Sequence, residues 1–297
     1  MDDTTNNYKH KFEDLISMYE VVCDWFDKLG FSYTRNRYGI YKKYLHDFQS
    51  MVSNKSFPKD REGLINFKRG FDNAYVEVHE IIRAYNGLKS IDSKEFHDQI
   101  KKVASGHEFR ANSENDQARD FLFELTTASR FVKAGYRVSL TGICDIVVDL
   151  ASGGMLFVEC KRIKSIKKIG VNVKKANKQI AKRINFARTS KVKGLVAINV
   201  TDLLPQTKDL LPDLASAATE IHRGVSNKFT RENIGPLSEG MNKKCFGVMC
   251  ESAKMHYLSH SSDIQGFTYS RHTDFLPYYE DELFRRLSAQ LSNQDIK

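Results

Sequence analysis

The sequence predicts a mixed α/β (α+β) protein in which an all-helical N-terminal domain precedes a domain with an αβββαβ core. Over roughly the first hundred residues, apolar side chains recur at the three- and four-residue spacing of amphipathic helices. Beyond residue 113 the pattern changes to one helix, three short strands, a second helix and a strand that is apolar on both faces. We therefore expect a helical domain at residues 1–105 and an α/β domain at residues 106–297, with the boundary near Ala104-Ser105-Gly106.

The helical domain is predicted from three apolar stripes, which are separated by breaks such as Phe57-Pro58. The stripes consist of Leu15, Met18, Tyr19, Val22 and Phe26; of Tyr41, Tyr44, Leu45 and Phe48; and of Phe71, Ala74, Tyr75, Val78, Ile81 and Ile82. The simplest interpretation of these aromatic-rich stripes is the core of a helical domain. The alternatives are base stacking, or an interface for a second copy of the chain or for a partner protein.

The first helix of the α/β core carries a carboxylate in an unusual position. Its apolar face is formed by Ala118, Phe121, Leu122, Leu125, Ala128 and Val132, and Gly135 provides a C-terminal stop. Glu124 lies three residues after Phe121 and four before Ala128, so it projects from the partly apolar face. An unpaired carboxylate there would be costly, which argues against an ordinary surface glutamate.

The three strands that follow are predicted at Tyr136–Leu140, Cys144–Leu150 and Met155–Ile163. Side chains alternate along a strand, so Glu159 and Lys161 share one face of the third strand. Asp145 joins that face only if the paired residue numbers of the hairpin sum to an even value. This requirement predicts a three- or five-residue loop, or a bulge, with Gly153 or Gly154 at positive φ.

A helix and a buried strand complete the predicted core. The basic helix at Asn172–Arg188 leads to the apolar strand Gly194–Val200, and a helix between two strands of one sheet indicates a parallel crossover. The remaining expected elements are a helix at residues 213–232, strands at Lys244–Cys250 and Gly266–Tyr269, and a helix at Asp281–Leu291.

The formal net charge of +9 is concentrated in one segment. Residues 161–193 contain 13 Lys and Arg residues and no Asp or Glu, whereas the rest of the chain has 33 basic and 37 acidic residues. Such local basicity predicts contact with a polyanion, here nucleic acid, rather than a solvated helix face. The candidate contact residues are Arg162, Lys164, Lys167, Lys168, Lys174, Lys175, Lys178, Lys182 and Arg183.

The residues on the hairpin face suit phosphodiester hydrolysis with a metal ion. Asp145 and Glu159 meet at hairpin distance, and two carboxylates about 4 Å apart repel by roughly 4 kcal/mol at an effective dielectric constant of 20. A divalent cation removes that repulsion, and hard oxygen ligands favour Mg²⁺, for which Mn²⁺ can substitute. Magnesium bound in this way keeps several waters, one of which can attack the phosphate. Lys161 can orient that water and offset phosphate charge, and Glu124 can reach the metal or its water from the helix.

A helical Glu, an Asp and a Glu-x-Lys in this order resemble the PD-(D/E)XK nuclease superfamily, which has the restriction-endonuclease-like fold. The resemblance rests on Glu124, Asp145 and Glu159-Cys160-Lys161 and covers roughly residues 113–200, although the Pro that often precedes the Asp is Cys144 here. It implies a Mg²⁺-dependent hydrolase, an endonuclease or an exonuclease, in which Asp145, Glu159, Glu124 and the backbone carbonyl of Cys160 bind the metal. It also implies 5′-phosphate and 3′-hydroxyl products, DNA as the usual substrate, and a role in restriction, phage defence or DNA repair.

One further position is tied to the resemblance. Some exonuclease-like branches of that superfamily carry a Gln, followed four residues later by a Tyr, in the helix after the Glu-x-Lys. Gln179 fits the first position, but residue 183 is Arg. Gln179 is therefore either an ordinary helix residue or a side chain that supports the metal ligands.

The sequence lacks the features that would indicate several other classes of protein. The chain has no apolar run of 18 residues, no Gly-rich phosphate loop, and no C-x-x-C pair among its five cysteines. Together with the polar N-terminal residues, these features favour a cytoplasmic protein with reduced cysteines. The predicted function is a metal-dependent nuclease that hydrolyses DNA. Two alternatives remain open: a non-catalytic nucleic-acid-binding module of the same fold, and an RNA nuclease with the same site.

Overall fold

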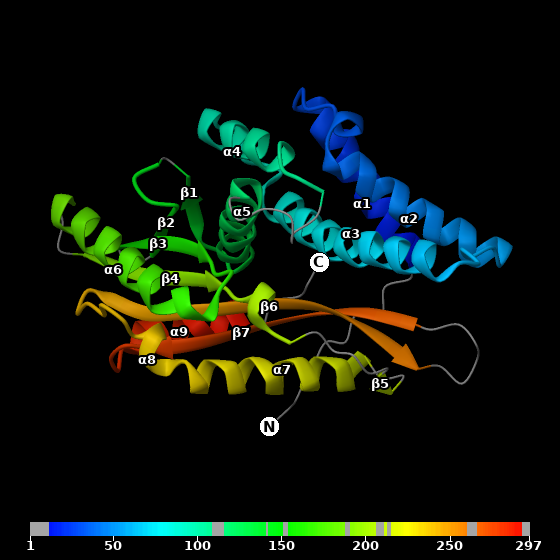
Figure 1. The fold of residues 1–297 in the computed structure, drawn as a ribbon. Coiled ribbons are helices and arrows are strands. Elements are labelled where there is room, and N and C mark those ends of the chain that lie inside the picture. Colours follow the sequence, from blue (N-terminus) through cyan, green and yellow to red (C-terminus); the bar gives the residue numbers. More distant parts are fainter. Residues whose placement is uncertain are drawn as a thin grey trace. The chain divides into compact units, whose positions relative to one another are not determined.

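The computed structural model of the chain describes residues 12–108, 116–140, 142–150, 154–187, 191–205, 211–212, 215–259 and 266–292. It shows a mixed α/β protein (Figure 1). The described residues divide into two compact units, one that ends at Leu122 and one that begins at Phe123. The division falls inside the helix that follows the boundary expected near residues 104–106. Within the described ranges, no helix has both the length and the hydropathy of a membrane span.

The first unit contains the helices α1 (Phe12–Lys28), α2 (Arg37–Asn54), α3 (Arg61–Leu88) and α4 (Lys94–Ala104), with a short 3-10 helix η1 at Tyr33–Arg35. The three predicted stripes lie on α1, α2 and α3, and most of their residues are buried. Aromatic rings of these helices pack on one another: the centroids of Phe26 and Tyr38 lie 4.8 Å apart, and those of Phe48 and Phe71 lie 4.4 Å apart. The dense aromatic residues of this unit thus build its core.

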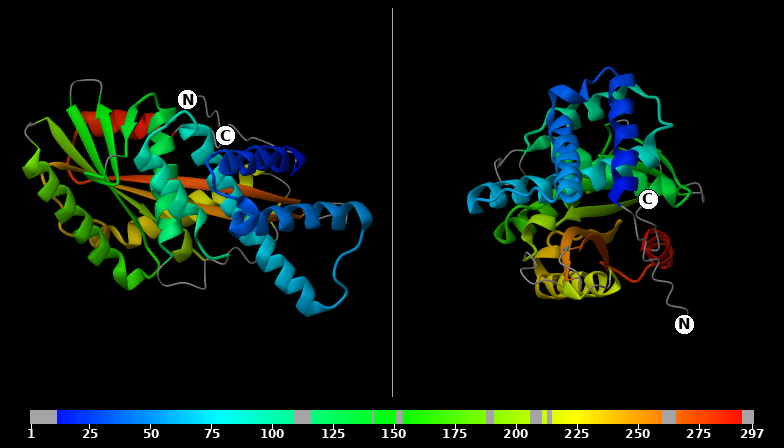
Figure 2. Two further views of the ribbon diagram at one scale, coloured as in Figure 1. Left: turned by 90° about the horizontal axis from the view of Figure 1, so that it is seen from above. Right: turned by 90° about the vertical axis from the view of Figure 1, so that its right-hand side faces the viewer.

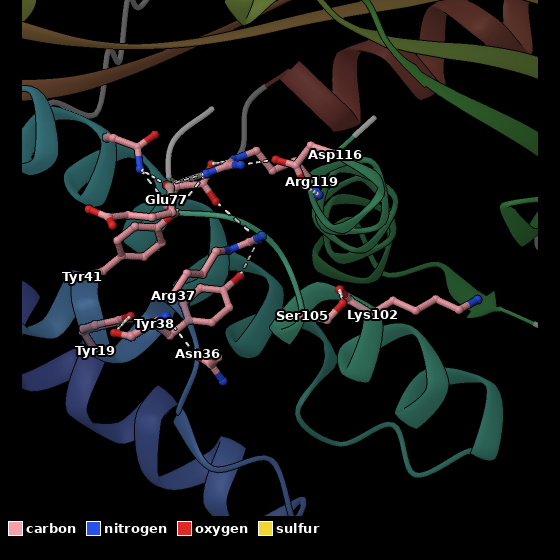
Figure 3. Close-up of polar contacts among 12 residues, drawn as sticks. Tyr19, Asn36, Arg37, Tyr38, Tyr41, Glu77, Lys102, Ser105, Asp116 and Arg119 are labelled. Atoms are coloured by element: carbon pink, nitrogen blue, oxygen red, sulfur yellow. Dashed lines mark hydrogen bonds and ion pairs between the residues drawn. The ribbon is translucent and has the colours of Figure 1, made fainter. Parts of the chain in front are cut away.

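A buried network of charged side chains links the helices of the first unit (Figure 3). Glu77 of α3 pairs with Arg37 of α2 at 3.6 Å and with Arg119 at 2.8 Å, and all three side chains are almost completely buried. Arg119 also pairs with Asp116 and donates to the Tyr41 hydroxyl at 3.0 Å. Two carboxylates and two guanidinium groups balance one another, as the burial of charge in a protein interior requires.

The second unit is built on a mixed sheet whose strands follow the order β1-β2-β3-β4-β6-β5, and β7 also pairs with β6 (Figure 1). The strands are β1 (Arg137–Ser139), β2 (Ile146–Leu150), β3 (Gly154–Arg162), β4 (Val192–Asn199), β5 (Leu211–Pro212), β6 (Cys245–Ser259) and β7 (Gly266–Pro277). The pairs β1–β2, β2–β3 and β6–β7 are antiparallel, whereas β3–β4, β4–β6 and β5–β6 are parallel.

Helices precede, connect and follow these strands. They are α5 (Gln117–Lys133), α6 (Ile169–Phe186), α7 (Ala215–Glu232), α8 (Ile234–Leu237) and α9 (Glu282–Ser292), with short 3-10 helices η3 (Ile166–Lys168) and η4 (Thr201–Leu203). Gly135 has a φ of +86° and follows the end of α5, as predicted for a glycine that terminates a helix. The order α5, three strands, α6 and β4 agrees with the order of elements expected from the periodicity.

The position of α6 follows from its apolar face. Ile180 and Ile184 of α6 belong to one buried cluster with Phe157 of β3 and Val196 of β4, so the helix covers these two strands. Gly194 permits the close approach, because a Cβ there would lie 2.2 Å from Ile180 Cγ2. On the same sheet, α7 runs along the β6–β7 hairpin (Figure 1).

The β6–β7 hairpin is much longer than the strands expected at Lys244–Cys250 and Gly266–Tyr269. Its pairs run from Gly247–Pro277 to Leu258–Gly266, and it forms a long ribbon (Figure 2). The periodicity missed this extension because the buried face of the ribbon under α7 is polar, which removes the apolar alternation of a half-buried strand. That face includes Ser252, His256, Ser270, His272 and Asp274.

Candidate active site

The hairpin of β2 and β3 brings three of the four predicted catalytic residues together. Lys161 Nζ lies 3.6 Å from Asp145 Oδ2 and 3.3 Å from Glu159 Oε2. Asp145 lies in the bend just before β2 rather than in the strand itself, and its Oδ2 accepts a hydrogen bond of 2.7 Å from the Cys160 backbone N–H. Two carboxylates and one ammonium group therefore form a single cluster.

The hairpin register is the one that this cluster needs. Ile146 pairs with Val158 and Leu150 with Gly154, so the paired numbers sum to an even value and the connecting loop has three residues. These residues, 151–153, lie outside the described ranges, so the predicted positive φ of Gly153 lies outside them too. Gly154 does not have a positive φ. It is instead needed for a close approach, since a Cβ there would lie 2.9 Å from the Lys191 carbonyl oxygen.

Glu159 is fully buried, and two cations share its charge. Lys161 approaches Oε2, and Arg183 of α6 forms an ion pair with Oε1. The side chains of Asp145, Lys161 and Arg183 are 20%, 18% and 26% exposed, whereas that of Glu159 is 0% exposed. The site therefore reaches solvent through Asp145 and the two cations, and Glu159 lies behind them.

Glu124, the fourth predicted residue, comes from α5 and lies near Cys160. Burial raises the pKa of the Cys160 thiol well above its ordinary value, and the negative charges of Asp145 and Glu124 raise it further. Because neighbours on a strand point to opposite faces, the Cys160 side chain lies on the face away from Glu159 and Lys161. The raised pKa therefore disfavours the thiolate of Cys160 at neutral pH.

The donor chemistry of this cluster suits a magnesium ion, provided that one cation moves. Within the described ranges, no group of three or more His, Cys, Asp or Glu side chains is arranged to hold a metal ion. Asp145 and Glu159 nevertheless supply two neighbouring carboxylates, and Mg²⁺ usually binds one or two carboxylates and keeps its remaining waters. Lys161 and Arg183 now neutralise these oxygens. A metal ion would therefore replace a cation of the protein.

The nine basic residues predicted to contact nucleic acid form an outward set and an inward set. Those that are exposed are Lys167, Lys168, Lys174, Lys175, Lys178 and Lys182. In contrast, the Arg162 side chain is 2% exposed and pairs with Asp202 at 3.1 Å, and Lys164 is half-buried. Arg183 contacts Glu159. Of the inward set, Arg162 and Arg183 thus contact carboxylates of the protein itself, and in the outward set Lys174 pairs with Glu239 at the surface.

Gln179 lies on α6 one helical turn before Arg183, on the same side of the helix. Its Oε1 atom is buried and has no hydrogen-bond partner among the described residues. This observation does not test whether Gln179 supports the metal ligands, so that role stays a prediction.

The contact between Arg183 and Glu159 was not expected from the sequence. Composition alone assigned Arg183 to the nucleic-acid surface. The available signal was its place between Ile180 and Ile184, two residues that face the core and that are buried. A basic residue next to the apolar stripe of a helix can reach the strands beneath it, whereas one on the opposite side cannot.

Comparisons of the chain with protein-family models, with curated proteins and with solved structures found no match. The likeness to the PD-(D/E)XK superfamily consequently rests on the residues of the cluster and on the order of the elements that carry them.

Proposed function

We propose that the chain is a Mg²⁺-dependent nuclease of the PD-(D/E)XK type, with a restriction-endonuclease-like core, that hydrolyses phosphodiester bonds of DNA. The observation that carries the proposal is the Lys161 ammonium group, 3.6 Å from the Asp145 carboxylate and 3.3 Å from that of Glu159. Two adjacent carboxylates provide metal ligands, and the ammonium group provides positive charge for a phosphate. The succession of α5, β1, β2, β3, α6 and β4 supports the same proposal.

Each residue of the cluster has a task in the proposed reaction. Asp145 and Glu159 would hold Mg²⁺, together with the backbone carbonyl of Cys160 that the resemblance implies. When bound, Mg²⁺ supplies an activated water and neutralises charge on the phosphate. The Lys161 ammonium group donates hydrogen bonds, so it orients the attacking water and offsets the charge that builds up on the phosphate oxygens. Glu124 lies outside this cluster, close to Cys160, and would accept a hydrogen bond from a further water.

Nucleic acid is the proposed partner because of the exposed lysines of α6. The opposite side of this helix packs on β3 and β4, and Arg183 connects the helix to Glu159. Helix α6 therefore carries exposed lysines on its outer side and contacts the Glu159 carboxylate on its inner side. DNA is favoured over RNA by the habit of the superfamily that the chain resembles. On α6 the exposed lysines are Lys174, Lys175, Lys178 and Lys182, and Lys167 and Lys168 of the preceding η3 are exposed as well.

A non-catalytic nucleic-acid-binding module is the second candidate. One observation favours it: both carboxylate oxygens of Glu159 already contact cations of the protein, as in a structural ion cluster. In such a module, the basic surface would bind nucleic acid and the cluster would only stabilise the hairpin.

The test is incubation of the purified protein with supercoiled, linear and single-stranded DNA and with RNA, each with and without Mg²⁺. The nuclease proposal expects Mg²⁺-dependent products with 5′-phosphate and 3′-hydroxyl ends. Cleavage of RNA alone would identify an RNA nuclease. Binding without cleavage in any divalent metal ion would favour the non-catalytic module.

A matched pair of variants ties any cleavage to the site. Asp145→Asn removes a proposed metal ligand and should abolish cleavage. Asp149→Asn makes the same chemical change on β2, at a residue that pairs instead with the exposed Arg137 at 2.6 Å. Cleavage that survives in Asp149→Asn and is lost in Asp145→Asn assigns the activity to the cluster.

A further inference from the structure

Arg183 differs from the other basic residues of its helix. Lys174, Lys175, Lys178 and Lys182 of α6 are exposed, and the Arg183 side chain is only 26% exposed. Its guanidinium group contacts Oε1 of Glu159, a carboxylate with no exposure to solvent. The one basic residue of this group that faces inward is thus the one in contact with a proposed metal ligand.

A second observation places the positive charge of Arg183 at the end of the hairpin. Burial raises the pKa of the Cys144 thiol to about 12, and the nearby charge that acts on it most strongly, in the opposite direction, is that of Arg183. Cys144 immediately precedes Asp145. The guanidinium group therefore lies near Cys144 as well as Glu159.

The charges of the cluster cancel while Arg183 is in place. Asp145 and Glu159 contribute two negative charges, and Lys161 and Arg183 contribute two positive charges. A neutral cluster has little attraction for a divalent cation, and a guanidinium group on Glu159 repels it directly. Lys161 contacts both carboxylates and is the proposed catalytic cation. Arg183, which contacts only Glu159 among these residues, is the cation that can leave without separating Lys161 from the site.

We propose that Arg183 is a positioning residue that neutralises Glu159 until a divalent metal ion displaces it, so that metal binding releases a guanidinium group toward the bound phosphate. This inference rests on the proposed nuclease site. It makes Arg183 a competitor of the metal ion when nucleic acid is absent. It also couples the two ligands, because a phosphate gives the released guanidinium group another partner and thereby favours metal binding.

Mn²⁺ affinity, measured by electron paramagnetic resonance on the full chain without nucleic acid, tests the inference independently of activity. Arg183→Gln removes the competitor and should bind Mn²⁺ about tenfold more tightly than the unmodified protein. Lys182→Gln is the matched control, since it removes the same charge from the preceding, exposed residue. Its Mn²⁺ affinity should stay within about twofold of that of the unmodified protein.

The outcomes separate this inference from the proposed function. Equal Mn²⁺ affinity in the unmodified protein and in Arg183→Gln would overturn the proposed role of Arg183, while the binding itself would still support the metal site. Failure of both proteins to bind Mn²⁺ would overturn the metal site and, with it, this inference. An equal gain in Arg183→Gln and Lys182→Gln would show a general effect of surface charge and would also refute a specific contact.

A measurement on the unmodified protein covers the case in which Arg183→Gln does not fold. Arg183→Lys keeps the positive charge, and its spectrum identifies the Arg183 Nε–H nuclear magnetic resonance signal by the loss of that signal. In the unmodified protein this signal should move during titration with Mg²⁺, because the guanidinium group leaves Glu159. A signal that keeps its position while Mg²⁺ binds would contradict displacement.

Discussion

The Lys161 ammonium group lies 3.6 Å from the Asp145 carboxylate, across the hairpin that β2 and β3 form. This contact depends on the register of the hairpin, because a slip of one residue would turn Asp145 toward the opposite face. The same register brings the Asp145 carboxylate to the Cys160 backbone N–H, which fixes its position through a hydrogen bond of 2.7 Å. The hairpin register thus brings Asp145, just before β2, together with Glu159 and Lys161 of β3.

Glu159→Gln should destabilise the protein as well as abolish metal binding. The buried Glu159 carboxylate contacts Lys161 and Arg183, and its loss leaves both cations without this counter-ion. Because both cations reach solvent, we expect a decrease of about 2 kcal/mol in the free energy of unfolding. Asp145→Asn, at a residue with partial solvent access, should cost less than about 1 kcal/mol. Urea denaturation followed by circular dichroism measures both values, and equal midpoints for the two variants would argue against a buried counter-ion role.

Replacing Lys174, Lys175 and Lys178 by Ala should weaken nucleic-acid binding and reduce its dependence on salt. Each phosphate that a lysine neutralises contributes about −0.9 to the slope of log affinity against log salt concentration on duplex DNA. Lys174 also pairs with Glu239 at the surface, so its share should be the smallest of the three. The control is Lys228→Ala, at a side chain of α7 that is 72% exposed. An unchanged slope in the triple variant would show that these lysines do not neutralise phosphates and belong to an ordinary solvated surface.

The protein should lose stability as the pH falls from about 6.5 toward 4. Burial, with a smaller contribution from nearby positive charges, lowers the pKa of His222 to about 3 and that of His256 to about 4. The unfolded chain therefore binds more protons than the folded one in this range, so the free energy of unfolding rises with pH by up to about 1.4 kcal/mol per pH unit for each histidine. The contribution is fully present above pH 6.5.

His222→Gln tests the origin of this pH dependence. Gln can keep a hydrogen bond to Ser252 or Ser270, which His222 contacts at 2.9 and 2.7 Å, but it does not titrate. Urea denaturation at several pH values should show a shallower slope for this variant, whereas His97→Gln, at a side chain that is 38% exposed, serves as the control. A slope equal to that of the unmodified protein would exclude His222 as its source.

Glu77→Gln should destabilise the first unit strongly. Glu77 contacts Arg37 and Arg119, all three side chains are buried, and removing one member of such a network leaves an uncompensated charge (Figure 3). The expected loss is about 3–5 kcal/mol. The exposed pair of Lys68 and Asp72 is the control, and Lys68→Ala should cost less than about 1 kcal/mol. Thermal unfolding followed by Trp25 fluorescence measures both, and a small effect of Glu77→Gln would mean that water reaches the network.

The elements around the cluster could be predicted because each follows a simple period. The helical stripes, the hairpin alternation and the doubly apolar β4 all lie close to the expected positions. The long β6–β7 ribbon could not, since buried histidine and serine side chains interrupt its alternation. The contact of Arg183 with Glu159 depends on how α6 packs over β3, and the sequence indicates it only through the place of Arg183 beside the apolar stripe of that helix.

Lys161→Ala tests whether the cluster of Asp145, Glu159 and Lys161 performs Mg²⁺-dependent cleavage. The measurement is the rate of Mg²⁺-dependent cleavage of supercoiled DNA, with DNA affinity measured in parallel, for the unmodified protein, Lys161→Ala and Lys228→Ala. We expect Lys228→Ala to cleave normally and Lys161→Ala to cleave at least about 100-fold more slowly while it still binds DNA. Cleavage by Lys161→Ala at the rate of the unmodified protein would contradict the account and place the active site elsewhere in the chain.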